Sequence, residues 1–433
     1  MRQQSFHLFS IGRMPLLGTH SHNGRCQSPV GGFSSRILTA ITSAVIAMTA
    51  TAADPAAVTR TTTPGPSMYC TRVAHTATAL SNGPILIAGG YSLSSPGPTS
   101  GTEPIPSAEL YHPAYKTFTV TGDMLYAREG HTATRLRTGE VLIAGGTHLS
   151  KIAELYDPAT GRFINAGSMH SIRRTGHTAT LLHNGMVLIV GGDDDSGAVA
   201  AASAEIYNPA THAFTLTGSM NTARKDHTAT LLTNGKALIA GGFGSSGEVV
   251  TAELYDPDTG HFTPTGAMRE ARYYHTATLL PGGRVLLVGG DAASGISASA
   301  ELFNPSNGTF TLTGGLAAAR HRHTATLQPD GTVLIAGGFN HIVHNNGRLC
   351  VYGRIPCSAQ VPAPTIETYH ASTGRFSAPT SGPAVAVQTA DALPGPMTLV
   401  AGGWVVVRKC VAPCTPLYYY YANYPTSETT LIP

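Results

Sequence analysis

Arginine and histidine recur together along the sequence, with each histidine three residues after its arginine and a glutamate later in the same copy. Imidazole nitrogens ligate metals and guanidinium groups bind anions, so this pattern contains the residue types of a metal site or an anion site. A residue type present in every copy of a repeat serves a need that every copy shares. We therefore interpret all three sets as structural, joined by hydrogen bonds or ion pairs. The histidines are His75, His131, His177, His227, His275 and His323, the arginines are Arg72, Arg128, Arg174, Arg224, Arg272 and Arg320, and the glutamates are Glu109, Glu154, Glu205, Glu253, Glu301, Glu367 and Glu428.

Functional side chains are expected instead among residues that break the repeat. An acidic loop begins at Asp193, an aromatic run near the C-terminus could stack on sugar rings or anchor a protein, and a basic cluster could attract an anionic group. For each, the alternative is a solvated loop or, for the aromatic run, rings packed beneath their own loop. The candidate ligand-binding residues are Trp404, Tyr418, Tyr419, Tyr420, Tyr421, Asp193, Arg320 and Arg322.

The elements that position these residues follow from the repeat itself. Each copy reads His-Thr-Ala-Thr, a turn with Gly, an aliphatic run ending in Gly-Gly, then Ala-Glu-Leu-Tyr-Asp-Pro and a Phe. Successive histidines are 56, 46, 50, 48 and 48 residues apart, and a degenerate seventh copy begins 65 residues later at Gln388. Short aliphatic runs between Asn-Gly and Asp-Pro turns are typical of strands. Seven antiparallel sheets of four strands are therefore predicted.

A single sheet of this kind cannot cover both of its faces, so neighbouring copies must stack around a central channel. The seventh copy ends before a fourth strand, and residues 58–68 precede the first copy. We therefore predict an all-β fold, a seven-bladed β-propeller whose last blade is closed by an N-terminal strand. The loops between strands two and three differ most among copies, which makes their end of the propeller the expected recognition face.

The N-terminal segment, the charge and the cysteines indicate the compartment of the protein and exclude some classes of partner. Residues 1–53 combine arginines, an apolar run and an Ala-Thr-Ala site, as in a secretory signal region, and leave 57–433 for the propeller. Beyond residue 53 there are 23 basic and 24 acidic residues, which excludes a basic surface for nucleic acid. No apolar run is long enough for a membrane span. Secretion favours disulfides, and proximity suggests Cys350 with Cys357 and Cys410 with Cys414, although spacing does not fix the pairing.

The Gly-Gly doublets, the following Tyr and the later aromatic residue resemble the Kelch-repeat propellers, including the central domain of the galactose oxidase family. The resemblance covers residues 57–433 and departs in using Phe where Kelch repeats carry Trp. In that family a Tyr-His pair ligates copper, which by resemblance would assign Tyr274 and His275 as copper ligands. The family's radical site also needs a second Tyr cross-linked to Cys and a further His, and only one copy here has a Tyr before its motif histidine.

The sequence therefore favours a secreted protein, extracellular or periplasmic, that acts as a non-catalytic binding scaffold. Its variable loops would present a surface to a protein or carbohydrate ligand, with no cofactor. The alternative that the resemblance implies is a copper-radical oxidase of the galactose oxidase type, with copper as its cofactor.

Overall fold

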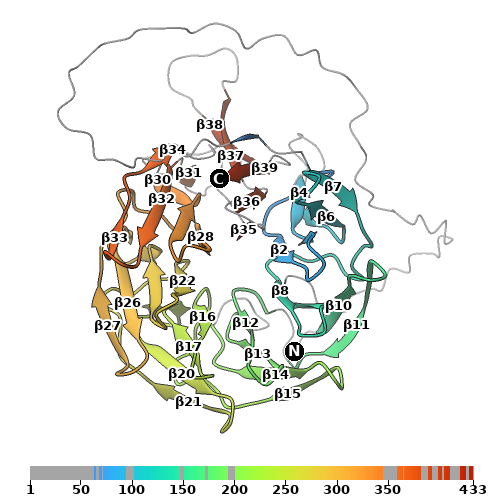
Figure 1. Ribbon diagram of the computed structural model, residues 1–433, viewed down its shortest axis with the longest axis horizontal. Helices are drawn as coiled ribbons and strands as arrows, with labels where there is room; N and C mark the ends of the chain where they lie inside the picture. The colour runs from blue at the N-terminus through green and yellow to red at the C-terminus, as the bar shows by residue number, and fades with distance from the viewer. Residues whose placement is uncertain are drawn as a thin grey trace, which may run out of the picture.

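The protein is described here by a computed structural model. It covers residues 63–64, 68–70, 72–93, 102–146, 151–170, 174–193, 200–344, 358–363, 365–381, 389–392, 398–401, 404–409, 420–425 and 429–432. Every regular element in these residues is a β-strand, so they contain no helix that could cross a membrane. The sheets stand around a central axis as the blades of a propeller (Figure 1). The predicted all-β propeller is confirmed.

One blade shows how the repeat folds. Strands β12 (Thr178–Leu181), β13 (Val187–Val190), β14 (Ala204–Asn208) and β15 (Ala213–Leu216) pair in order, all antiparallel. Gly185 closes the first turn with a φ of 86°, which glycine adopts without steric strain. All four residues of β13 are buried because neighbouring blades cover both faces of the sheet, whereas β15 forms the outer edge and buries only one residue in four.

Five further sheets repeat this pattern. The first blade contains β2 (Thr76–Ala79), β3 (Ile85–Ala88), β6 (Ala108–His112) and β7 (Thr117–Val120), and the second contains β8 (Thr132–Arg135), β9 (Val141–Ala144), β10 (Ile152–Asp157) and β11 (Arg162–Ser168). The fourth contains β16 (Thr228–Leu231), β17 (Ala237–Ala240), β20 (Ala252–Asp256) and β21 (His261–Pro264), and the fifth contains β22 (Thr276–Leu279), β23 (Val285–Val288), β26 (Ala300–Asn304) and β27 (Thr309–Leu312). The sixth contains β28 (Thr324–Leu327), β29 (Val333–Ala336), β32 (Thr365–His370) and β33 (Arg375–Phe376), with β34 (Thr380–Ser381) also paired to β32.

One more sheet joins the two ends of the described chain. It contains β35 (Thr389–Ala392), β36 (Thr398–Ala401), β39 (Thr429–Ile432) and the N-terminal β1 (Thr63–Pro64), and Thr63 lies opposite Leu431. Strand β35 lies beside both β28 and β2, between the sixth and first blades. Six blades are described with their side chains, and the count of seven stays a prediction that depends on this last sheet.

Short hairpins extend from one end of the propeller, after the Gly-Gly doublets. They are β4 (Tyr91–Leu93) with β5 (Thr102–Pro104), β18 (Phe243–Gly244) with β19 (Gly247–Glu248), β24 (Asp291–Ala292) with β25 (Gly295–Ile296), β30 (Phe339–His344) with β31 (Ser358–Pro362), and β37 (Trp404–Lys409) with β38 (Tyr420–Pro425). All five follow the second strand of their sheet, so they share the end at which the sequence predicts variable loops.

Aliphatic and aromatic side chains fill the space between blades. In the third blade Tyr207 and Phe214 lie opposite each other with ring centroids 4.8 Å apart, and they pack against Leu142 and Leu155 of the second blade. Burying a Phe side chain contributes about 1.5–3 kcal/mol, and the same pairing recurs in all six blades. Phe therefore fills the position where Kelch repeats carry Trp.

The repeated arginine and glutamate form a buried ion pair within each of the six blades. In the fourth blade Arg224 donates to Glu253 at 2.8 Å and to the Gly241 carbonyl, also at 2.8 Å. Glu253 also accepts the backbone N–H groups of residues 221 and 222. The pair thus ties the link between blades to the Gly-Gly turn and to strand three. The predicted link is confirmed for the arginines and glutamates, with pairs Arg72–Glu109, Arg128–Glu154, Arg174–Glu205, Arg224–Glu253, Arg272–Glu301 and Arg320–Glu367.

Candidate functional site

The residue before each motif histidine forms a ring around the propeller axis, which we call the axial ring. Each member lies two residues before the first residue of its blade's innermost strand, and each innermost strand lies beside that of the next blade. All six members have a left-handed backbone conformation, with φ between 52° and 64°. The axial ring consists of Ala74, Gly130, Gly176, Asp226, Tyr274 and Arg322.

The left-handed backbone follows from hydrogen bonds between blades. The N–H of Asp226 donates to the carbonyl of Gly176, that of Tyr274 to Asp226, and that of Arg322 to Tyr274, at 2.8, 3.2 and 2.9 Å. This conformation suits glycine and costs other residues about 1–2 kcal/mol each. Three large polar residues are therefore held in a strained conformation where glycine would serve the backbone better, which is characteristic of a functional site.

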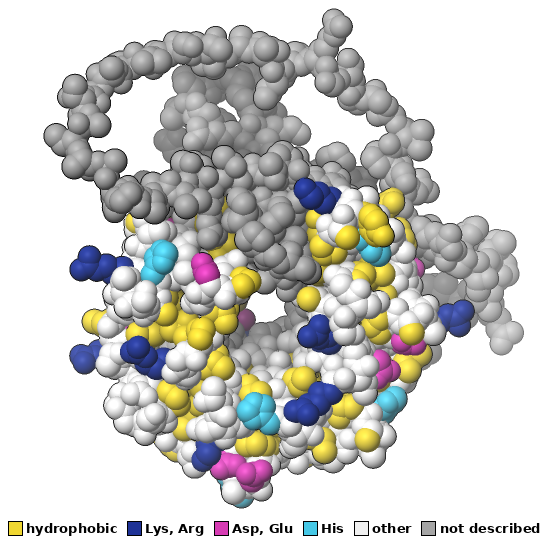
Figure 2. All heavy atoms as spheres, in the orientation of Figure 1, with side chains coloured by type: hydrophobic (Ala, Val, Ile, Leu, Met, Phe, Trp, Pro, Cys, Tyr) yellow, Lys and Arg dark blue, Asp and Glu magenta, His cyan; other side chains and the backbone are white. Residues whose placement is uncertain are grey.

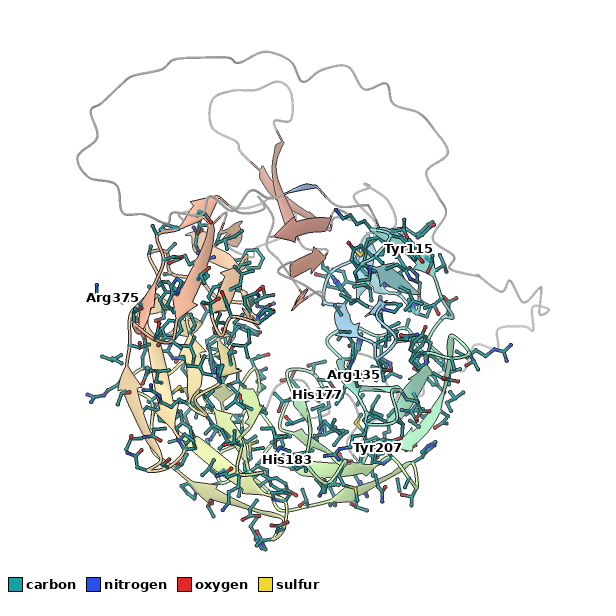
Figure 3. The ribbon with its side chains drawn as sticks, in the orientation of Figure 1. Tyr115, Arg135, His177, His183, Tyr207 and Arg375 are labelled. Carbon is teal, nitrogen blue, oxygen red and sulfur yellow. The ribbon has the colours of Figure 1, made fainter. Side chains whose placement is uncertain are left out.

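The axial ring is one-sided. The first three blades contribute Ala74, Gly130 and Gly176, whereas the fourth to sixth contribute Asp226, Tyr274 and Arg322. A pocket of about 320 Å³ lies among these side chains, and Figure 2 shows an opening at the centre of the ring. Figure 3 shows His177, one of the lining residues, at the inner edge of the third blade. The pocket is lined by Gly176, His177, Asp226, His227, Tyr274, His275, Arg322 and His323.

The three polar members of the ring form a connected group. The guanidinium carbon of Arg322 lies 3.8 Å from the centroid of the Tyr274 ring, a cation–π contact. The Tyr274 hydroxyl hydrogen-bonds the Asp226 carboxylate. Tyr274 therefore connects a cation on one neighbouring blade to a carboxylate on the other.

Burial dominates the titration of this group. It raises the pKa of the Asp226 carboxyl to about 6, against the opposing effects of the Arg322 charge and the Tyr274 hydrogen bond. Burial likewise raises the pKa of the Tyr274 phenol to about 12, with Arg322 again opposing the shift. At neutral pH Tyr274 is thus a neutral donor and Asp226 is an acceptor, and Asp226 gains its proton in mildly acidic solution.

The motif histidines that line the pocket are part of the seams between blades. The Nε2 atom of His275 lies 3.0 Å from the Thr228 hydroxyl of the preceding blade. Four other motif histidines make the same contact, and burial lowers the pKa of each of these four to about 3. A Cβ on Gly241, in the Gly-Gly doublet, would lie 2.7 Å from the His275 ring. The histidines are therefore structural as expected, but their partner is a threonine and not the glutamate.

These features identify a fold with a known counterpart. The chain is similar to a copper alcohol oxidase. The solved structure is that of a fungal alcohol oxidase of the AA5 family in complex with copper, with a TM-score of 0.63, 16% identity, and coverage of 86% of this chain and 76% of that one. This likeness supports the fold resemblance drawn from the Kelch-type repeats. No family model matches the sequence, and no curated protein matches it.

The described residues do not fit the copper site that the family resemblance implies. They contain no group of three or more His, Cys, Asp or Glu side chains that could hold a metal. His275 has its Nε2 on Thr228, and the cation of Arg322 lies directly over the Tyr274 ring, where it would oppose a bound cupric ion. Cys70 is disulfide-bonded, with a partner outside the described residues. The predicted pairs of Cys350 with Cys357 and Cys410 with Cys414 also lie outside them.

A second set of side chains joins neighbouring blades around the pocket mouth. Asp193 accepts an ion pair from Lys225 of the next blade at 2.7 Å, and Thr175 donates to its other oxygen at 2.6 Å. At the equivalent positions of later blades, Phe243 and Tyr273 are in edge contact at 5.3 Å. Asp291 pairs with His321 at 2.7 Å. We call these three contacts the seam pairs. Asp193, predicted as a ligand-binding residue, is placed here in a contact between blades.

The other predicted residues fall into two groups. Arg320 is fully buried and bound to Glu367, so no donor of its guanidinium faces solvent, whereas Arg322 lines the axial pocket. In β37 and β38 the backbone places Trp404 opposite Pro425, and Tyr421 opposite Arg408. Their side chains lie outside the described part of the chain, as does that of Tyr420. Tyr418 and Tyr419 are outside it altogether.

Sequence reasoning did not select Asp226, and it considered Tyr274 only as a copper ligand. A signal was present, because the residue before the motif histidine is small in three copies and is Asp, Tyr or Arg in the other three. Glycine in two of six copies indicates a backbone conformation that other residues adopt with strain. A large polar residue there is therefore a candidate functional residue.

Proposed function

We propose that the chain binds a small hydroxyl-rich ligand, a carbohydrate or another polyol, in the axial pocket. The observation that carries this proposal is the strained triad of Asp226, Tyr274 and Arg322, which faces the space left by the small members of the axial ring. A carboxylate, a phenol and a guanidinium supply the acceptors and donors that hydroxyl groups need. The pocket volume of about 320 Å³ is within the range of small-molecule sites.

In this proposal the propeller is the scaffold that presents the binding site. The residues beside the axial ring pair with those that follow the Gly-Gly doublets, so the ring lies at the end of the propeller where the sequence predicts recognition. We propose that the sheet containing β1 and β35 is a seventh blade, and that the protein is secreted on the basis of residues 1–53. The scaffold then holds the pocket rigid, and the hairpins around it restrict which ligands enter.

A copper alcohol oxidase is the second candidate. It is favoured by the similarity to the fungal enzyme and by the place of Tyr274 in the pocket. Two measurements distinguish the candidates. An oxidase retains copper after dialysis and releases hydrogen peroxide from primary alcohols. A binding protein shows saturable sugar binding and neither of these properties.

The direct test is isothermal titration calorimetry with a panel of neutral sugars and polyols. Asp226→Asn and Tyr274→Phe should each weaken binding about tenfold, because the first replaces a charged acceptor with a neutral amide and the second removes a hydroxyl group. Asp258→Asn and Tyr115→Phe are matched controls, since both residues are exposed and Tyr115 lies on the outer rim (Figure 3). Binding that is unaffected by both pocket substitutions would exclude this pocket as the site.

A further inference from the structure

Arg322 differs from the repeated arginines in one decisive respect. Those six are buried, and each is paired with the glutamate on strand three of its own blade. Arg322 is exposed, and within the described part of the chain it forms no ion pair with a carboxylate. The pocket therefore contains a guanidinium whose charge is not matched by a bound acid.

The position of this guanidinium is fixed. It stacks 3.8 Å from the Tyr274 centroid, and its backbone is held by the N–H bond to the Tyr274 carbonyl. Its charge lowers the pKa of Tyr91 in the first blade and of Asp226 in the fourth, each against a larger effect of burial. Because the charge of Arg322 acts on residues of both the first and the fourth blade, its guanidinium lies near the centre of the axial ring. An oriented fork of N–H donors at such a place matches the two oxygens of a carboxylate.

We propose that the ligand of the axial pocket is a sugar acid, with its carboxylate on Arg322 and its hydroxyl groups on Tyr274 and Asp226. This inference rests on the proposed function and specifies its ligand. A carboxylate carries one charge, and so meets less repulsion from nearby Asp226 than a phosphate of about two charges would.

The surroundings do not neutralise Arg322. The four lining histidines are buried and held neutral, because burial lowers their pKa values. Lys225 is paired with Asp193, and His321 with Asp291, so neither pair leaves an acid for Arg322. Two acids remain near the group: Asp226, on the far side of Tyr274, and Glu129, whose charge acts with that of Arg322 on Tyr91.

The test compares D-galacturonate with D-galactose, which differ only in the carboxylate, by calorimetry on the full chain at about pH 5. A uronic acid is ionised there, since its pKa is close to that of other carboxyl groups. We expect galacturonate to bind at least about tenfold more tightly than galactose, a ratio that corresponds to one charge-assisted pair. Arg322→Gln should reduce the ratio to about one, and Arg322→Lys should keep part of it.

The control is Arg162→Gln, which removes an exposed arginine at the start of β11 and should leave the ratio unchanged. Galactose 6-phosphate tests whether the pocket binds a phosphate in place of a carboxylate. An oligomer of galacturonate tests whether the ligand is a polysaccharide and not a free sugar acid. Equal affinity for galacturonate and galactose, or an Arg322→Gln variant that keeps the preference, overturns the inference and leaves sugar binding intact. Failure of every sugar to bind would overturn the proposed function as well.

Discussion

The guanidinium carbon of Arg322 lies 3.8 Å from the centroid of the Tyr274 ring, across the boundary between the sixth and fifth blades. Both residues occupy a backbone conformation that disfavours them, with φ values of 52° and 53°. Elsewhere in the axial ring the first three blades have Ala or Gly at this position. Within the axial ring, large polar side chains in this conformation therefore occur only in the fourth to sixth blades, whereas Lys116 and His212 adopt it in turns between strands three and four.

The cost of this conformation is testable at two glycines that differ in their surroundings. A Cβ on Gly130 would have no atom closer than 3.7 Å, so Gly130→Ala isolates the backbone effect. At Gly176 the added Cβ would lie 2.8 Å from Asp226 Oδ1. We expect Gly130→Ala to lower the free energy of unfolding by about 1 kcal/mol with ligand binding unchanged. Gly176→Ala should lower it further and also weaken binding, as measured by urea unfolding and calorimetry. Equal behaviour of the two variants would contradict this account.

Asp226 gives the protein a pH dependence of defined sign. Its pKa is about 6 in the folded protein against an ordinary 3.8, so between about pH 4 and 6 the unfolded chain loses this proton first. The contribution of Asp226 to stability is thus most favourable below pH 4, falls as pH rises to about 6, and is constant above. For a partly exposed carboxyl we expect a change of about 1–2 kcal/mol.

Asp226→Asn removes this proton equilibrium and is the natural comparison. The free energy of unfolding of the variant, measured in urea across this pH range, should rise relative to wild type by about 1–2 kcal/mol from pH 4 to 7. A constant difference between the two proteins across the range would show that the carboxyl titrates normally.

Much of the fold could be predicted because the same sequence pattern occurs in copy after copy of the repeat. Each Gly-Gly doublet, each Tyr with its later Phe and each Arg with its Glu serves packing between blades, and packing imposes the same demand on every copy. The axial site was less accessible, because Asp226, Tyr274 and Arg322 are about 48 residues apart in sequence and converge only when consecutive blades close around the axis. The role of Asp193 was hidden for a similar reason, since its partner Lys225 belongs to the next copy.

The buried ion pairs make a strong prediction about stability. Glu253→Gln leaves Arg224 buried without a counter-charge and replaces one of the oxygens that accept the backbone N–H groups of residues 221 and 222. Breaking such a pair from one side costs about 3–5 kcal/mol. Chemical denaturation should show a loss of this size for Glu253→Gln and less than about 0.5 kcal/mol for the exposed control Asp258→Asn. A loss below 1 kcal/mol for Glu253→Gln would mean that the pair is not needed to hold the blade.

The seam pairs predict an energetic coupling between neighbouring blades. Lys225 and Asp193 lie 2.7 Å apart with only 24% and 17% of their side chains exposed, whereas the pair of Lys236 with Asp256 lies within one blade at 3.0 Å and is 39% and 23% exposed. Because solvent screens the more exposed pair, a double-mutant cycle of Lys225→Met with Asp193→Asn should give a coupling of about 1 kcal/mol, and the same cycle at Lys236 and Asp256 less than about 0.5 kcal/mol.

Both cycles are measured by urea unfolding of the four proteins in each. The seam pairs differ in chemistry from one boundary to the next, an ion pair with Lys225, an aromatic contact at Tyr273 and a carboxylate with His321. If the fifth or sixth blade stood in place of the fourth, Asp193 would face Tyr273 or His321 in place of Lys225, and the coupling would be lost. Because the seam pairs differ from one blade boundary to the next, they favour one order of the otherwise similar blades. Equal coupling energies in the two double-mutant cycles would contradict this role of the seam pairs.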